Sequence, residues 1–218
     1  MTGNEFQPEG NYYDKYGSKN PIVKKLMKGF FSALDSMLEA SGFGTSDGEC
    51  LEAGCGEGNV TDHICRFISG TGKNIGFTAF DISSNLTEEN KKNYPNVRFF
   101  QHDIYEPLDS GTVPASGEFD LIVCSEVLEH LEEPEKAVRN LMQYGSRFIF
   151  SVPCEPVWRI LNMARGKYLS HMGNTPGHIQ HYSYKGFIKM LGGCGLKVVK
   201  SARPLPWSMV YCEKQNAH

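Results

Sequence analysis

The sequence predicts an α/β protein with a doubly wound, mostly parallel sheet of seven strands. Three observations support this prediction. Short apolar strands alternate with helical patterns from about residue 46 to residue 191, which is typical of a parallel sheet. A turn with three glycines joins the first strand of this alternation to its first helix. Two strands then follow one another around Pro204-Leu205-Pro206, which predicts an antiparallel C-terminal hairpin.

An amphipathic helix precedes the alternating part. Residues 21–38 place apolar side chains at helical spacing, and Asn20-Pro21 supplies a cap and a favoured first residue. The residues before this helix are polar and aromatic, and they include Tyr16. Residues 1–45 are therefore expected to form an N-terminal segment ahead of the sheet.

The glycine-rich turn follows a short strand that ends in an acid. Residues 50–52 lead into the glycines of residues 54–58, and residues 60–69 have a helical pattern. Glycine permits positive φ angles and lets a ligand approach the main chain, and the N–H groups at the helix start would face that ligand. The spacing differs from the G-x-G-x-x-G of dinucleotide sites, and Glu52 and Glu57 would repel a pyrophosphate. The turn therefore favours a ligand with a positive amino group or sulfonium.

Acids also stand at the ends of the next two strands. The second strand, residues 74–80, ends at Asp81, and the third, residues 97–101, leads into His102-Asp103-Ile104. A polar helix over residues 85–93 connects them. An acid at the tip of the second strand can accept hydrogen bonds from two ribose hydroxyls.

The second half of the chain supplies the rest of the sheet. The fourth strand, residues 119–124, opens onto Ser125-Glu126-Val127-Leu128-Glu129-His130-Leu131, and Pro134 suits the first position of the next helix. Gly192-Gly193 are expected to end the last helix. The remaining elements are expected in this order: a helix over 134–143, a strand over 147–152, a helix over 183–191, and strands over 196–202 and 207–212.

These motifs together resemble the class I S-adenosylmethionine-dependent methyltransferases, most closely the small-molecule group often called type 11. Glu52-x-Gly54-x-Gly56-x-Gly58 is similar to the family's first motif, and Ser125 to His130 to the motif after its fourth strand. The resemblance runs from about residue 46 to the C-terminus. It implies a Rossmann-like fold and transfer of a methyl group to an oxygen, nitrogen or carbon atom of a small-molecule acceptor, with S-adenosylhomocysteine as the second product.

The resemblance also implies roles for individual residues. The glycine turn would meet the amino-acid end of the cofactor, the acid after the second strand its ribose, and the pair after the third strand its adenine. In related enzymes the segment before the glycine turn folds over the cofactor. The expected cofactor-binding residues are Tyr16, Glu52, Gly54, Cys55, Gly56, Asp81, Ile82, Asp103, Ile104, Ser125 and Glu126.

A long connection, residues 154–182, separates the fifth strand from the last helix. Ligands bind at the carboxyl ends of strands in doubly wound sheets, so this segment is expected to lie over the methyl donor and shape the acceptor pocket. Trp158 and Tyr182 are its candidate substrate contacts. We therefore expect one domain over residues 1–218, divided into segments 1–45, 46–153, 154–182 and 183–218.

Three histidines are candidate catalytic residues: His130, His178 and His181. Imidazole titrates near neutral pH and could accept a proton from an attacking hydroxyl. Hydrogen bonds that only hold the loop would explain the same residues. The His178-x-x-His181 spacing is not H-E-x-x-H, and no nearby Cys pair or acid completes a ligand set, so no metal site is expected.

Composition limits the class of protein. With 218 residues, 40% of them hydrophobic and 22% charged, the chain can bury one good core. A net charge of -3 gives no general attraction to polyanions, so nucleic acid is not expected as the substrate. No signal-like or membrane-spanning run is present, and the seven cysteines contain no C-x-x-C pair, so we expect reduced thiols, a cytoplasmic location and no membrane partner. The thiol of Cys55 is expected to be exposed. Oligomeric state is not predicted.

Two other functions stay open at this stage. An NAD(P)-dependent oxidoreductase could also use a glycine turn and an acid after the second strand, although the residues after Gly58 argue against it. The second open function is that of a protein that binds S-adenosylmethionine without turning it over, because cofactor contacts do not prove catalysis.

Overall fold

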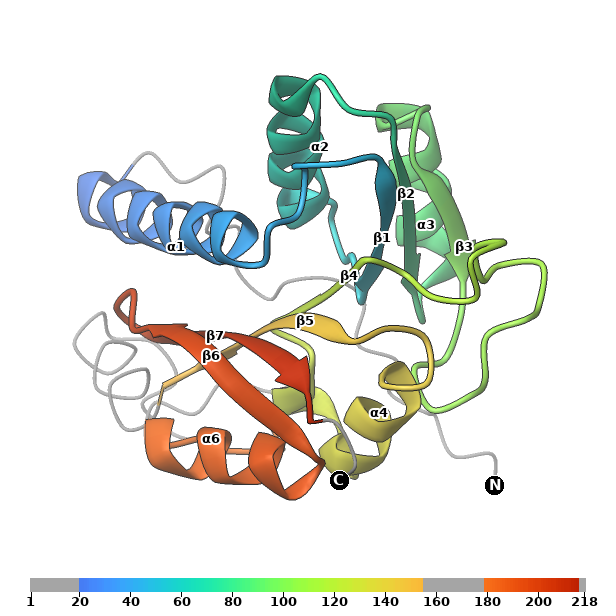
Figure 1. Cartoon of the computed structure of the whole chain (residues 1–218). Coiled ribbons are helices and arrows are strands. Elements are labelled where there is room, and N and C mark those ends of the chain that lie inside the picture. Colours follow the sequence, from blue (N-terminus) through green and yellow to red (C-terminus); the bar gives the residue numbers. More distant parts are fainter. Residues whose placement is uncertain (1–19, 155–178, 216–218) are drawn as a thin grey trace, which may run out of the picture.

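The structure of the protein is a computed structural model that describes residues 20–154 and 179–215. A seven-stranded sheet forms its centre, in the order β3-β2-β1-β4-β5-β7-β6 (Figure 1). The strands from β3 to β5 pair in parallel, and β7 runs antiparallel to both β5 and β6. This confirms the predicted fold class. The strands are β1 (Gly48–Ala53), β2 (Ile75–Asp81), β3 (Arg98–Gln101), β4 (Leu121–Ser125), β5 (Arg147–Pro153), β6 (Leu196–Ala202) and β7 (Trp207–Lys214).

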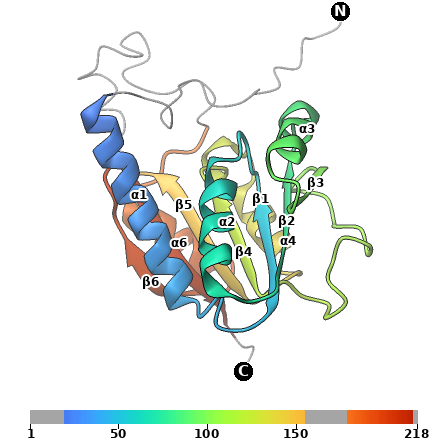
Figure 2. The same cartoon turned by 90° about the horizontal axis from the view of Figure 1, so that it is seen from above.

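Helices cover both faces of the sheet. Figure 2 shows α1 and α2 on one face and α4 and α6 on the other. The helix α3 packs on β2 and β3, at one end of the sheet. The helices are α1 (Pro21–Ala40), α2 (Asn59–Thr71), α3 (Ser84–Asn93), the short 3-10 helix η1 (Leu128–His130), α4 (Pro134–Leu141) and α6 (Tyr184–Gly193).

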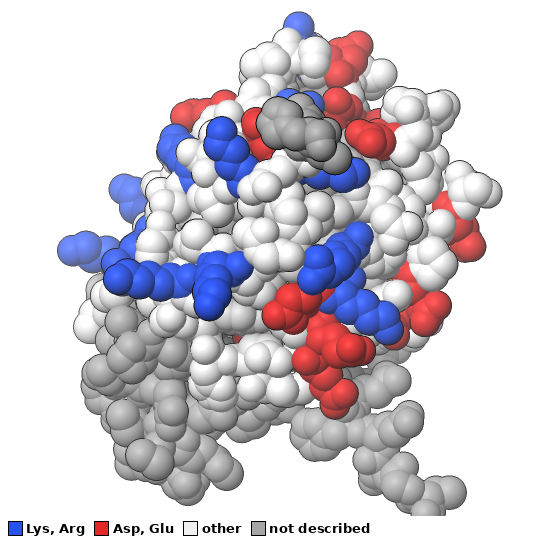
Figure 3. All heavy atoms as spheres, turned by 60° about the horizontal axis from the view of Figure 1, so that its bottom comes forward, with Lys and Arg blue, Asp and Glu red and all other residues white. Residues whose placement is uncertain are grey.

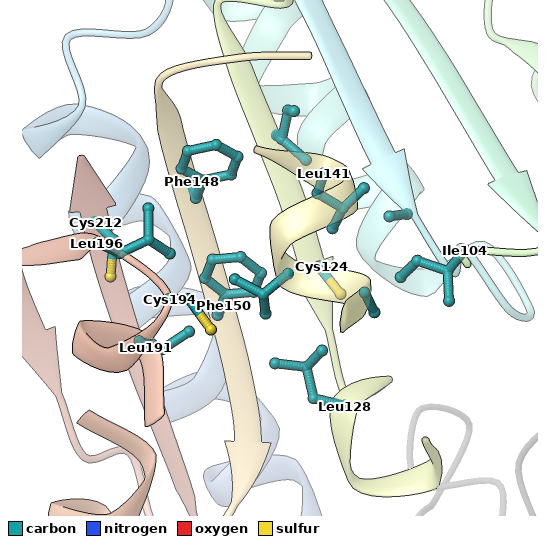
Figure 4. Packing of buried hydrophobic residues seen from close by; sticks show 14 of the residues in the cluster. Ile104, Cys124, Leu128, Leu141, Phe148, Phe150, Leu191, Cys194, Leu196 and Cys212 are labelled. Carbon is teal, nitrogen blue, oxygen red and sulfur yellow. The ribbon is translucent and has the colours of Figure 1, made fainter. Parts of the chain in front are cut away.

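Each face of the sheet has its own apolar core. On the α4 and α6 face, Phe148 and Phe150 of β5 pack with Leu141 of α4 and Leu191 of α6 (Figure 4). The core of the opposite face joins the buried stripe of α1 to side chains of β7. Since apolar side chains lie on both faces of the central strands, those strands have the nearly continuous hydrophobic sequences of a covered parallel sheet.

The helix α1 begins as its sequence predicts. The side chain of Asn20 accepts a hydrogen bond from the backbone N–H of Ile22 at 2.9 Å, and Pro21 takes the first helical position. Its buried residues recur every three or four positions and face the sheet. The helix is two residues longer than the predicted range and ends at Ala40.

Two local predictions need correction, and one short helix was not predicted. The helix α6 continues through Gly192-Gly193, because Cys194 N–H still bonds to helical carbonyls, and Gly195, with φ +94°, makes the turn into β6. The strand β4 begins at Leu121, and Phe119 forms only an isolated bridge. The helix η1 was not predicted, since three residues are too few to show a period.

The surface carries both signs of charge. Lysines and arginines lie near acids on the face that Figure 3 shows, in keeping with the net charge of -3. Within residues 20–154 and 179–215, no helix combines the length and the apolar composition needed to span a bilayer.

The packing of α1 can be tested at Leu34, whose side chain is 1% exposed. Replacement by alanine should lower the free energy of unfolding by about 2–5 kcal/mol, because it removes buried methyl groups and leaves a cavity. Lys28→Ala, on the exposed side of the same helix, should change it by less than about 0.5 kcal/mol. Urea denaturation measures both, and equal effects of the two substitutions would contradict the packing of α1 on the sheet.

Candidate active site

Two adjoining cavities open near the carboxyl ends of β1, β2 and β4. The larger has a volume of about 360 Å³ and the smaller about 70 Å³. Gly54, Gly56 and Glu126 line both, so the cavities meet at the glycine turn. Pockets for small ligands span roughly 300–1,000 Å³, and the larger cavity falls in that range.

The glycine turn is held by close contacts that exclude other residues. Gly54 and Gly58 both have φ +79°. A Cβ on Gly54 would lie 2.3 Å from a methyl carbon of Val127, and one on Gly58 would lie 2.5 Å from the amide oxygen of Asn90. Both positions therefore need glycine for conformation and for space. The N–H groups of Gly54 and Cys55 donate to the carbonyl of Phe80, which ties the turn to β2.

Asp81 joins the turn to the larger cavity. One carboxylate oxygen accepts the Gly56 N–H at 2.8 Å, and the other accepts the Ser83 N–H at 2.9 Å. A carboxylate has about four lone-pair directions, so both oxygens can accept further hydrogen bonds from a ligand. Asp81 lines this cavity together with Ile82, Asp103 and Ile104, which brings these four predicted residues into one wall.

Glu52 lines the smaller cavity and is 1% exposed. Burial raises the pKa of this carboxyl to about 8, the hydrogen bond from the Thr61 hydroxyl opposes the rise, and the charge of Asp81 adds to it. The carboxyl is therefore largely protonated at neutral pH. A cation in the cavity would favour the charged form, so binding of a cation at this point releases a proton.

Glu126 follows β4 in a left-handed conformation, with φ +58°. Its N–H donates to the carbonyl of Ser151, and the indole N–H of Trp207 donates to its carboxylate. Positive φ angles are rare outside glycine, and they gather at functional sites when the surroundings hold them. The hydroxyls of Ser125 and Ser151 lie 2.6 Å apart beneath this turn.

Cys55 is the one member of the turn whose environment differs from the prediction. The sequence predicts an exposed thiol, but the residue is only 5% exposed, because its side chain packs under α3 near Asn90. Burial also raises the pKa of its thiol. Cys55 still lines the smaller cavity, as do Glu52, Gly54, Gly56, Ser125 and Glu126 of the predicted set.

The candidate catalytic and substrate residues separate in the structure. His130 lines the larger cavity at the end of η1, whereas His181 is exposed and lines neither cavity. The ring of Tyr182, the second expected substrate contact, is 9% exposed and packs in the core against Phe187. Tyr16, Trp158 and His178 lie outside the described residues. In the part of the chain that is described, no group of three or more His, Cys, Asp and Glu side chains could hold a metal ion.

The end of the 154–182 connection is attached to the cavity wall. The N–H groups of Ile179 and Gln180 donate to the carbonyl of Glu129, at 2.8 and 2.9 Å. The Gln180 side chain also donates to the carbonyls of Leu131 and Glu132. The chain therefore returns from this connection directly against η1.

Several residues of the site were not predicted. Most are neighbours of predicted residues in the sequence, so their position beside a motif was the available signal. No such sequence signal pointed to Trp207, because its partner Glu126 is 81 positions away. Trp207 lines neither cavity. The unpredicted residues that do line them are Phe80, Leu86, His102, Tyr105, Val127 and Leu131 in the larger cavity, and Asn59 and Val60 in the smaller.

A family model described as a methyltransferase domain matches residues 27–201. The chain belongs to this methyltransferase family. The match confirms the predicted class I methyltransferase and its methyl donor, S-adenosylmethionine.

Relatives of this methyltransferase align over part of their length. The ubiquinone biosynthesis O-methyltransferase of Psychrobacter cryohalolentis is 28% identical over 120 residues, 55% of this chain and 44% of the relative. The highly reducing polyketide synthase ltbA of Aspergillus luteorubrus is 27% identical over 174 residues, 72% of this chain and 5% of the synthase. The chain thus spans less than half the length of these curated relatives.

Solved structures of methyltransferases share the fold. The citrinin polyketide synthase CMeT domain superposes with a TM-score of 0.64 at 15% identity, covering 91% of this chain and 58% of that one. The S-adenosylmethionine-dependent methyltransferase of Mesorhizobium loti gives 0.60 at 15% identity, covering 85% and 98%.

The raised pKa of Glu52 predicts a pH dependence of stability. From pH 4.5 to about 8 the unfolded state loses this proton while the folded state keeps it, so stability falls as the pH rises. Glu52→Gln stays neutral and can still accept from Thr61, so its stability relative to the wild type should increase between about pH 5 and pH 8. Urea denaturation across this range measures the difference, and a difference that does not change with pH would contradict the buried, protonated carboxyl.

Proposed function

We propose that this protein transfers the methyl group of S-adenosylmethionine to an oxygen, nitrogen or carbon atom of a small-molecule acceptor. The pair of cavities that meet at the glycine turn carries this proposal. The smaller, with Glu52, suits the amino-acid end of the donor, and the larger suits the nucleoside. There Asp81 would accept the ribose hydroxyls, with Asp103 and Ile104 at adenine.

The reaction we infer is an in-line displacement at the methyl carbon. The acceptor atom forms a bond to the methyl group as the carbon–sulfur bond breaks, and the electron pair stays on sulfur. Sulfonium is a good leaving group, so the protein's main task is to align the two reactants. Of the candidate histidines His130, His178 and His181, His130 lines the larger cavity, and we propose it as the group that takes a proton from a hydroxyl acceptor.

The proposal includes the organisation of the chain. Residues 46–153 would hold the cofactor, residues 1–45 would cover it with a contact from Tyr16, and residues 154–182 would shape the acceptor pocket with Trp158. The O-methyltransferases among the relatives support hydroxyl oxygen as the first acceptor to test. Seven free thiols, six of them buried, support a reducing compartment such as the cytoplasm.

Binding at Asp81 tests the cofactor assignment. Asp81→Asn should weaken S-adenosylhomocysteine binding by about tenfold or more in calorimetry, because it removes the charge that accepts the ribose hydroxyls. Asp109→Asn, exposed and outside both cavities, should leave the affinity unchanged. Equal affinities of wild type and Asp81→Asn would refute the ribose role.

A thermal-shift comparison separates the methyltransferase from an oxidoreductase. S-Adenosylhomocysteine should raise the melting temperature of the wild-type protein by an amount that grows with the logarithm of its concentration above the dissociation constant, and NAD(H) and NADP(H) should not. Stabilisation by the dinucleotides alone would contradict the proposed function.

Turnover distinguishes an enzyme from a protein that only binds the donor. Wild-type protein with methyl-labelled S-adenosylmethionine and a panel of catechols, primary amines and β-dicarbonyl compounds should transfer label to at least one class. At donor concentrations below the dissociation constants of both proteins, Asp81→Asn should form the product about tenfold more slowly than the wild type. Donor binding with no transfer to any member of the panel would favour a binding protein.

A further inference from the structure

Among the described residues, the junction between the two cavities contains one charged side chain. Of the three residues that line both cavities, Gly54 and Gly56 contribute main chain only, and Glu126 contributes a carboxylate. Glu52 lines only the smaller cavity, and Asp81 lines only the larger. The sulfur of S-adenosylmethionine joins its amino-acid half to its nucleoside half. If the halves occupy the two cavities, the sulfur lies at the junction, beside Glu126.

The position of Glu126 is fixed from two sides. Its backbone is held in the left-handed region by the bond from its N–H to Ser151, at 2.9 Å. Its carboxylate accepts the indole N–H of Trp207, which is 3% exposed at the start of β7. The indole packs edge-on against Phe30 of α1, with ring centroids 5.1 Å apart. A hydrogen bond to a carboxylate from a buried, packed donor restricts the carboxylate to one place.

We propose that Glu126, positioned by Trp207, recognises the positive charge of the sulfonium and so makes the protein prefer S-adenosylmethionine to S-adenosylhomocysteine. This inference rests on the proposed function. The donor carries a cation at sulfur, whereas the product has a neutral thioether there. Coulomb attraction to a half-buried carboxylate is stronger than in bulk water and disappears once the methyl group has left. Glu126 therefore retains the donor and favours release of the product.

The test compares three ligands that differ at one position. Calorimetry should show that the wild type binds S-adenosylmethionine and sinefungin, which carries an amine in place of the methylated sulfur, about tenfold more tightly than S-adenosylhomocysteine. Glu126→Gln, close in shape and neutral, should reduce this preference to about twofold or less, with little change in the affinity for S-adenosylhomocysteine. Glu118→Gln, which removes an exposed carboxylate outside both cavities, should keep the wild-type preference.

Trp207 is tested through Glu126. Trp207→Phe keeps an aromatic ring but removes the indole donor, so it should lower the preference for the charged ligands. In the Glu126→Gln background the same substitution should have no further effect on the preference, because a positioning role acts only through the carboxylate. A purely structural role of Trp207 would change the preference equally in both backgrounds, and this result would overturn the assignment of Trp207.

The outcomes separate the two proposals. If the wild type binds S-adenosylhomocysteine and Glu126→Gln shows the same ligand preference as the wild type, the role of Glu126 is overturned and the proposed function stands. If the wild type binds none of the three ligands, both proposals are overturned. Glu126→Gln alone decides the role of the carboxylate if Trp207→Phe does not fold.

Discussion

The close contact between the glycine turn and its neighbours is the constraint on which the site depends. Gly54 touches Val127 beyond β4, and Gly58 touches Asn90 of α3, at distances that leave no room for a Cβ. The turn is therefore pressed between two elements that are distant in sequence. Its Gly56 N–H reaches Asp81 and its carbonyl accepts the amide of Asn90. These contacts join β1, β2 and α3 into one rigid wall, and both cavities open beside it.

Much of the fold could be predicted from the sequence because its signals are local. Strand length, helical period and the cap at Asn20 each depend on residues that are close in the chain. The acids at the strand ends could be placed as well, since parallel strands bring their carboxyl ends to one edge of a sheet. Asp81 and Asp103 thus line one cavity although 22 positions separate them in the sequence.

Other parts of the site depend on contacts that no local pattern encodes. Trp207 reaches Glu126 only because β7 inserts between β5 and β6. Tyr182 is an aromatic residue of the predicted acceptor-side segment, but its ring is buried and its hydroxyl donates to the carbonyl of Leu128 in η1, 54 positions away. The burial of Cys55 likewise follows from the position of α3. In each case the deciding partner lies on a different element, and the tertiary packing overrides the expectation from residue type.

A crystal structure with S-adenosylhomocysteine tests the central claim most directly. We expect adenosine in the larger cavity with its ribose hydroxyls on Asp81, the amino-acid end beside Glu52, and the sulfur next to Glu126. Crystals soaked with this ligand whose two cavities stay empty, or in which it binds away from the glycine turn, would contradict it.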